Sequence, residues 1–184
     1  MKYLYKLANL QDFILSNSFQ YLEMILYTAV CFFLPLFIGH PQAFVGIIVN
    51  AMLIASALNI KGAKLLPVII APSLGALSRG ILFGPFTIFL VYMIPFIWIG
   101  NTILVFSFKW LKLRLKKNYW LTLVIGSLLK SGFLFLSAYV LFLLGIIPVI
   151  FLTAMGTMQL ITALAGGAAA FGFQCTKKRL TKSF

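Results

Sequence analysis

The chain has 184 residues, of which 62% are hydrophobic and 9% are charged, whereas a soluble domain carries about 25% charged residues. This composition excludes water as the main solvent and indicates an integral membrane protein. Fifteen Lys and Arg residues against two acidic residues give a net charge of +13, but the basic residues lie between long apolar runs without an aromatic stacking motif. We therefore expect anionic lipid headgroups, and not nucleic acid, as their neighbours.

The N-terminal segment, residues 1–19, has an amphipathic pattern. Tyr3, Leu7, Leu10 and Ile14 follow a helical stripe, with polar residues between them. These polar interruptions, and the lack of a small-residue cleavage site, argue against a signal peptide. We predict a helix that lies in the plane of the membrane interface, with a flexible tail as the alternative.

Six apolar segments approach the roughly 20 residues that a helix needs to cross the hydrocarbon of a bilayer. They span residues 20–38, 43–60, 64–82, 86–108, 119–144 and 147–174. Breaks rich in Gly and Pro, or basic runs such as 109–118, separate them. The segments lack the alternation of barrel strands. We therefore predict an all-α bundle of six transmembrane helices forming a single domain, residues 1–184, with a basic cytoplasmic tail over 175–184.

The basic residues also predict the orientation of the bundle. With the N-terminus in the cytoplasm, thirteen of the fifteen Lys and Arg residues fall on the cytoplasmic side, as the positive-inside rule requires. The other two, Arg79 and Lys130, fall within predicted helices. The sequence thus predicts a multi-pass protein of the cell membrane with both termini in the cytoplasm.

Ionisable side chains inside a membrane segment are energetically expensive and mark candidate functional sites. Lys130 lies near the middle of the fifth segment and shares a helical face with Ser127, Ser131 and Ser137. We expect it to contact a ligand or to line a pathway, the alternative being a lysine that snorkels or bonds to a neighbouring helix. Arg79 ends the third segment, where a guanidinium can hold a carboxylate or phosphate, or anchor the helix at the interface.

Three amides complete the candidate substrate-binding set: Asn50, Asn101 and Gln159, each in a different predicted helix. Each can donate and accept hydrogen bonds across a helix interface. Small residues share their faces, and Gly and Ala cluster over residues 163–172. We therefore interpret these amides as either ligand contacts or packing contacts. We interpret the small-residue cluster first as a site of tight helix packing and second as a docking surface for a partner.

The remaining reactive residues do not form a catalytic or metal-binding pattern. Cys31, Cys175 and His40 are too few and too widely spaced for a haem, an iron–sulfur site or a disulfide framework. Glu23, near the cytoplasmic end of the first segment, is expected to pair with a basic residue. With no nucleophile and base pair, carboxylate pair or metal-ligand spacing, we expect no enzymatic activity, no cofactor and no metal site.

Three short stretches resemble a known family. They are GIIVNAML over Gly46–Leu53, APSLGALSRG over Ala71–Gly80 and PFIWIGN over Pro95–Asn101. Together with the size and the six-helix plan, they resemble the substrate-binding S components of energy-coupling factor (ECF) type ABC transporters.

The resemblance implies a protein that captures a vitamin or other micronutrient outside the cell. Such a protein delivers its substrate by reorienting against a coupling membrane protein and two ABC ATPases. The chain has no P-loop of its own, which agrees with this division of labour. By position, the resemblance places Arg79, Lys130 and Gln159 nearest to the ligand.

The chain departs from the family pattern at the docking motif. The family carries small residues four apart on the first helix, but here Ala51 and Ala55, on the second predicted helix, have that spacing. Either the docking surface is displaced, or the resemblance concerns the fold alone.

The expected function is therefore a binding subunit for a small-molecule substrate whose charge complements the cationic groups, such as a carboxylate. One alternative is a structural or assembly subunit of a larger membrane complex without its own ligand. Another is a channel, for which the lack of intramembrane acidic residues disfavours a cation pore and leaves an anion pore open.

Overall fold

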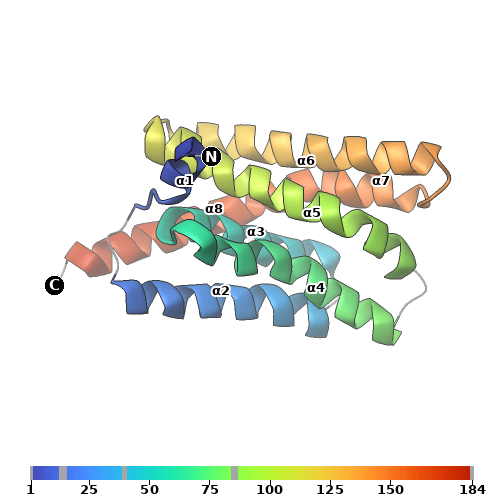
Figure 1. The fold of residues 1–184 in the computed structure, drawn as a ribbon, viewed down its shortest axis with the longest axis horizontal. Coiled ribbons are helices and arrows are strands. Elements are labelled where there is room, and N and C mark those ends of the chain that lie inside the picture. The colour runs from blue at the N-terminus through green and yellow to red at the C-terminus, as the bar shows by residue number, and fades with distance from the viewer. Residues whose placement is uncertain (1, 13–15, 39–40, 84–86, 183–184) are drawn as a thin grey trace.

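The computed structural model describes residues 2–12, 16–38, 41–83 and 87–182, and the regular structure in this part of the chain is helical (Figure 1). The helices are α1 (Lys2–Ala8), α2 (Asn17–Phe37), α3 (Gln42–Asn59), α4 (Leu65–Phe83), α5 (Thr87–Ser107), α6 (Tyr119–Leu143), α7 (Ile150–Met155) and α8 (Thr157–Lys182). A 3₁₀ turn at Gly62–Lys64 precedes α4, and a π-helical turn at Phe108–Arg114 extends α5. The predicted all-α fold is confirmed.

Long apolar helices dominate the structure. Among the described residues, five helical spans are long and apolar enough to cross a membrane: Asn17–Phe37, Gln42–Asn59, Thr87–Arg114, Tyr119–Leu143 and Ile150–Lys177. Helix α4 has 19 residues, which corresponds to about 28 Å of rise, and it occupies the place of the third predicted segment.

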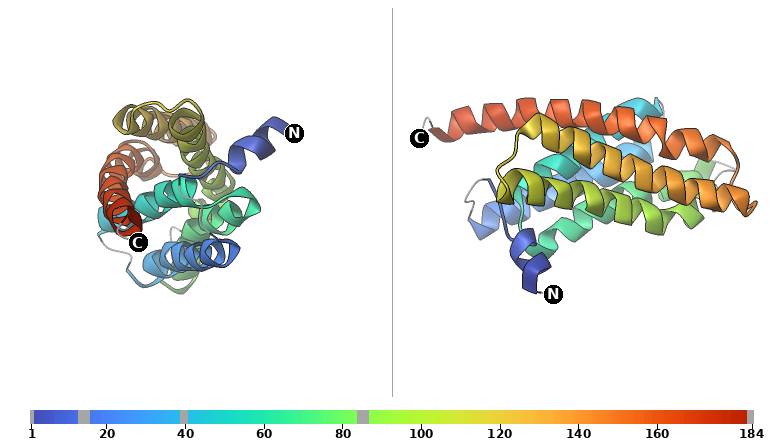
Figure 2. Two further views of the ribbon diagram at one scale, coloured as in Figure 1. Left: turned by 90° about the vertical axis from the view of Figure 1, so that its left-hand side faces the viewer. Right: turned by 90° about the horizontal axis from the view of Figure 1, so that it is seen from above.

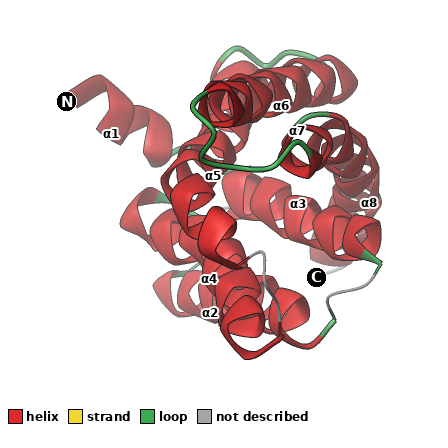
Figure 3. Ribbon diagram, turned by 90° about the vertical axis from the view of Figure 1, so that its right-hand side faces the viewer, coloured by secondary structure: helices red, strands yellow, loops and turns green. Residues whose placement is uncertain are grey.

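The six long helices form a ring in the order α2, α4, α5, α6, α8 and α3, which closes again on α2. The end-on view shows α3 toward the middle of this arrangement (Figure 3). Ten residues of α3 between Val49 and Asn59 are buried, because neighbouring helices cover it on several sides. The buried polar residues of α3, Asn50, Ser56 and Asn59, therefore face other helices.

Glycines permit the closest helix contacts. A Cβ on Gly75 of α4 would lie 2.1 Å from the backbone oxygen of Phe32 in α2, and a Cβ on Gly166 of α8 would lie 2.5 Å from that of Ile47 in α3. The tight packing predicted for the small-residue cluster is thus confirmed at Gly166.

The pair Ala51 and Ala55 lies inside the bundle. Both side chains are buried, and Gly166 of α8 lies directly against the Ala51 backbone. Because α8 covers this face of α3, the pair does not form a surface on which a partner helix can dock.

Both termini lie toward the same end of the bundle (Figures 1 and 2), and the elements at this end carry many basic residues. At this end lie α1, the 3₁₀ turn, the π-helical turn and the connection to α6. The described basic residues there are Lys6, Lys61, Lys64, Lys109, Lys112, Arg114, Lys116, Lys117 and Lys177. The connections at the opposite end contain no Lys or Arg in the sequence. This is the arrangement that the positive-inside pattern predicts.

The N-terminal helix is shorter than the predicted segment of residues 1–19. Helix α1 ends at Ala8, and α2 begins at Asn17, where the hydroxyl of Ser16 accepts from the backbone N–H of Phe19. Of the expected apolar stripe, Leu7 is buried, and Ile14 lies outside the described residues. Residues 9–12, which include the polar Asn9, Gln11 and Asp12, are not helical, so the helix that the apolar spacing predicts ends at Ala8.

Lys109 is not a loop cation, as its position in the basic run suggested. Its side chain is fully buried, and its ammonium donates to the backbone oxygens of Leu10 and, at 2.6 Å, Ile60. The nearby N–H of Asp12 donates to the oxygen of Leu58 at 2.7 Å. The carbonyl end of a helix attracts a cation, so Lys109 binds the end of α3 and attaches the N-terminal segment to it.

Glu23 pairs with a basic residue, as predicted, and the partner is Lys177 of α8. The Tyr27 hydroxyl donates to the Glu23 carboxylate at 3.3 Å. The Asn59 amide donates to Tyr27 at 3.1 Å, and the Gln174 amide donates to Asn59 at 3.0 Å. This chain of contacts ties α2, α3 and α8 together near the basic end, and α8 stays helical to Lys182 through the segment predicted as a tail.

The sixth predicted segment, 147–174, is interrupted. Helix α7 ends at Met155, Gly156 has non-helical backbone angles (φ −93°, ψ −95°), and α8 begins at Thr157. A Cβ on Gly156 would lie 2.8 Å from both the Leu152 oxygen and the Phe135 ring. The break is thus located where the Phe135 ring of α6 packs against a residue without a side chain.

Candidate functional site

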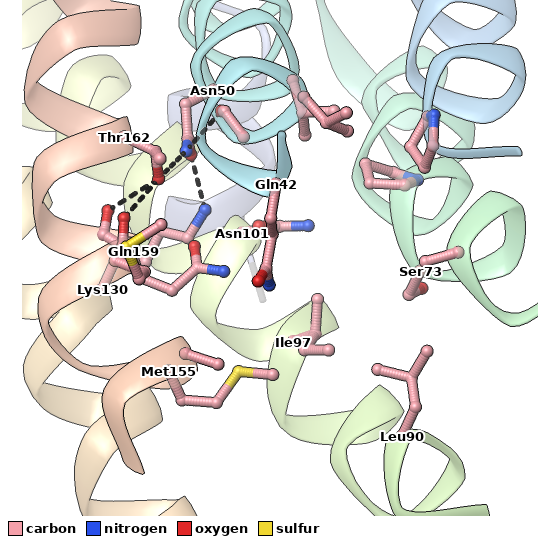
Figure 4. A pocket seen from close by; sticks show the side chains of 18 residues that line it. Gln42, Asn50, Ser73, Leu90, Ile97, Asn101, Lys130, Met155, Gln159 and Thr162 are labelled. Atoms are coloured by element: carbon pink, nitrogen blue, oxygen red, sulfur yellow. Dashed lines mark hydrogen bonds between the residues drawn. The ribbon is translucent and has the colours of Figure 1, made fainter. Parts of the chain in front are cut away.

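A cavity of about 170 Å³ lies among the helices in the half of the bundle away from the termini (Figure 4). Its lining comes from the last turns of α2, the first half of α3, α4, α5, the middle of α6 and both sides of the α7–α8 break. The polar lining residues are Gln42, Asn50, Ser73, Asn101, Lys130, Gln159 and Thr162. Polar groups from five different helices therefore converge on one space.

Lys130 is the one ionisable side chain among the described residues that line this cavity. Its side chain is 2% exposed, and its ammonium donates to the side-chain oxygen of Asn50 at 2.6 Å. The hydroxyls of Ser131 and Ser137 bond to carbonyls of their own helix. Of the polar stripe predicted on α6, Lys130 is thus the member that lines the cavity.

The orientation of the Asn50 amide is determined by its other contacts. Its nitrogen donates to the oxygen of Gly46 at 2.9 Å and to the hydroxyl of Thr162 at 3.2 Å. The Thr162 hydroxyl in turn donates to the Met158 oxygen at 2.7 Å. The Asn50 oxygen therefore faces Lys130 as an acceptor.

Thr162 was missed by the sequence analysis. Its position three residues after Gln159, on the same face of α8, was the available signal. A threonine hydroxyl that bonds to its own helix is common and has no distinctive spacing, so the signal was weak.

Helix α5 presents two side-chain donors to α4 at the edge of the cavity. The Asn101 amide donates to the oxygen of Ile69 at 3.0 Å, and the Trp98 ring N–H donates to the hydroxyl of Ser73 at 2.6 Å. Pro72 lies in the same part of α4 and has no backbone N–H of its own to donate. These bonds fix the Asn101 nitrogen and leave its oxygen as an acceptor on the cavity.

Four of the five predicted substrate-binding residues thus line the same cavity: Lys130, Asn50, Asn101 and Gln159. The Gln159 amide makes no hydrogen bond to another described side chain or backbone group, so it is available to a ligand. Arg79 lies elsewhere. Its guanidinium donates to the backbone oxygen of Phe37 at 3.0 Å and that of Leu36 at 3.5 Å, and so satisfies carbonyls at the end of α2.

The chain was compared with known protein families, curated proteins and solved structures. None of them matches it. The chemistry of the site is therefore judged from its own groups, which are one ammonium, several carboxamides and an apolar wall that includes Met155 and Met158. Such a set can bind a small solute by charge and hydrogen bonds.

No group of three or more His, Cys, Asp or Glu side chains that could hold a metal ion lies within the described part of the chain. The two cysteines are free, with Cys31 buried and Cys175 exposed. The two acidic residues of the sequence, Asp12 and Glu23, do not line the cavity.

Proposed function

We propose that this protein is a membrane-embedded solute-binding subunit that holds a small molecule in the cavity beside Lys130. The observation that carries the proposal is the convergence of Lys130, Asn50, Asn101 and Gln159, from four different helices, on one space inside an apolar bundle. Buried polar groups in a membrane are expensive unless they serve packing or function, and Gln159 has an amide that packing contacts do not use.

The size of the cavity restricts the solute. Pockets for drug-sized ligands occupy about 300–1,000 Å³, whereas this cavity has about 170 Å³. This supports a small metabolite or micronutrient as the ligand.

The packing of the other half of the bundle supports a binding protein over a channel. Between the cavity and the basic end, a core of large apolar side chains fills the bundle, including Tyr27, Leu53, Leu104, Phe108 and Leu123. Each of these is at most 2% exposed. Conduction needs a continuous path for the ion through the protein, and this packed core favours a binding protein over such a path.

The resemblance to ECF transporter S components extends the proposal to uptake. In this scheme the protein lies in the cell membrane with both termini in the cytoplasm, and the cavity is reached from outside. A coupling membrane protein and two ABC ATPases supply the energy. Because Ala51 and Ala55 are buried, these partners must dock on another surface.

The decisive experiment is to purify the tagged protein from its native membranes, release its small molecules by denaturation and identify them by mass spectrometry. Ala154 lines the cavity, so Ala154→Phe should fill it and abolish the co-purified solute. Ala168 is an exposed residue of α8, and Ala168→Phe is the matched control that should retain the solute. No enriched solute, or equal loss in both variants, would refute the binding function.

An assembly subunit of a larger membrane complex is a second candidate, and one observation favours it. Ala168, Ala169 and Gly172 form an exposed strip of small residues on α8, where a partner helix can approach the backbone closely. Protein mass spectrometry of the same purification separates the two proposals. Two ATPases and a coupling protein support uptake, whereas an unrelated stoichiometric complex without a solute supports assembly.

The proposed orientation has its own test. In a background of Cys31→Ala and Cys175→Ala, single cysteines are introduced as Val149→Cys and Lys117→Cys at exposed positions of opposite ends. A membrane-impermeant maleimide should label the first in intact cells and the second only after permeabilisation. The reverse pattern contradicts the proposed orientation.

A further inference from the structure

We infer that the solute is a small monoanion, most simply a monocarboxylate, whose negative group lies against the Lys130 ammonium beside Asn50. This inference rests on the proposed binding function and deepens it by assigning the charge of the ligand. It follows from the charges around the cavity, from the donors that Lys130 has available and from the fixed orientation of one amide.

Neither acidic side chain of the sequence belongs to the lining of the cavity, so neither neutralises Lys130 there. The sequence contains two acidic residues. Glu23 forms its ion pair with Lys177 of α8, and the backbone of Asp12 bonds to the end of α3 at the basic end. A buried charge without a counter-charge is strongly unfavourable, so an anion that enters the cavity gains an interaction that no protein group supplies.

In the proposed complex the cavity contributes a single cation, Lys130. Lys130 is the one Lys or Arg in its lining, and the Arg79 guanidinium is occupied with the carbonyls at the end of α2. One positive charge balances one negative charge. A dicarboxylate or a phosphate dianion would bring a second charge into an apolar bundle without a partner.

Lys130 and Asn50 together are arranged to receive an anion. An ammonium has three N–H donors, and the Asn50 oxygen accepts one of them. That oxygen cannot turn away, because the amide nitrogen is held by Gly46 and Thr162. Asn50 therefore positions the ammonium without neutralising it, and N–H donors of the ammonium remain for a carboxylate. A charged carboxylate accepts a stronger hydrogen bond from an ammonium than a neutral acceptor does.

The remainder of the cavity suits the uncharged body of such a solute. Figure 4 shows Lys130, Asn50, Gln159 and Thr162 gathered on one side, with Ile97 and Met155 further along the cavity. The apolar side chains can contact a hydrocarbon body, and the Gln159 amide can bond to a polar substituent.

The test measures binding by the purified protein of a set of monocarboxylates from acetate to benzoate. Each is compared with its primary amide and with a dicarboxylate of the same skeleton, such as phthalate for benzoate. Isothermal calorimetry gives the affinities. At least one monocarboxylate should bind about tenfold or more tightly than its amide and its dicarboxylate. Lys130→Met should remove this preference, and Lys130→Arg should retain it.

A second variant tests the same assignment without removing the lysine. Asn50→Asp places a carboxylate beside Lys130 and so supplies the missing counter-charge from the protein. It should abolish monocarboxylate binding, and an unchanged circular-dichroism spectrum should show that the variant is folded, although the bond from residue 50 to the Gly46 oxygen is lost. Lys64→Met, at the basic end, is the control that should leave the affinities unchanged.

The two proposals fail in different ways. If amides bind as tightly as their acids, or if Asn50→Asp binds monocarboxylates as well as the parent does, the charge assignment is wrong and the binding function stands. If no member of the set binds but a native solute co-purifies, the charge of that solute decides. A neutral or cationic solute overturns the charge assignment. If no solute of any kind binds or co-purifies, both proposals are overturned.

Discussion

The contact between α2 and α4 predicts opposite effects for the same substitution at two glycines. Replacing Gly75 with Ala would place a methyl carbon 2.1 Å from the backbone oxygen of Phe32, whereas ordinary contact begins at 3.4 Å. A backbone atom cannot move aside as a side chain can. The two helices must therefore separate by more than about 1 Å along their interface, which loosens contacts over several turns.

The magnitude follows from comparison with Gly132 of α6, where an added Cβ meets nothing within 4 Å. Alanine is favoured over glycine in a helix by about 0.8–1.0 kcal/mol, and this gain is common to both sites. Overpacking costs about 1–3 kcal/mol and applies only at Gly75. We expect Gly132→Ala to stabilise the fold. We expect Gly75→Ala to be about 2–3 kcal/mol less stable than Gly132→Ala, which is the upper part of the range for overpacking, because the atom in the way is the backbone oxygen of Phe32.

The assay is reversible unfolding of the purified variants in mixed micelles with increasing SDS, followed by circular dichroism and tryptophan fluorescence. Both variants keep the same composition and the same added methyl group, so the difference in unfolding free energy isolates the contact. Equal stability of Gly75→Ala and Gly132→Ala would show that α2 and α4 do not pack as closely as the structure places them.

Two further predictions concern the basic end. A double-mutant cycle of Glu23→Gln and Lys177→Met should give a coupling energy of about 1–2 kcal/mol in the same unfolding assay, because the pair is partly shielded from solvent; additivity of the two substitutions would contradict a direct contact. Lys109→Met should accelerate amide hydrogen exchange over residues 2–12, since it removes the bonds from the ammonium to Leu10 and Ile60, whereas Lys116→Met at an exposed position should not. Exchange that is equally slow in both variants would show that Lys109 does not hold the N-terminal segment.

The candidate site was largely predictable because a membrane makes polar residues conspicuous. Lys130, Asn50, Asn101 and Gln159 stand out in apolar helices, and all four line the cavity. Arg79 stands out for the same reason but bonds to the end of α2. A polar residue within an apolar segment is recognised from the sequence as costly to bury. The sequence does not say whether a ligand or a backbone carbonyl forms hydrogen bonds with that residue.

Lys109 shows the converse limit. In the sequence it opens a basic run, and such a run is typical of a loop exposed to water. In the structure the helix continues through it as a π-helical turn, and the side chain is directed toward the end of α3. Burial of this lysine depends on where the C-terminal carbonyls of another helix lie, and no local pattern contains that information.

The sequence by itself determined the solvent, the helical class and the approximate spans, because these depend on hydrophobicity and length within single segments. It also indicated the clustering of basic residues at one end. Only the tertiary structure decided which helices are neighbours, that neighbouring helices cover α3 on several sides, and that the Asn50 oxygen faces Lys130. The bond between Asn50 and Lys130 joins residues 80 positions apart. Such contacts depend on the packing of whole helices and on glycines such as Gly166 that allow close approach.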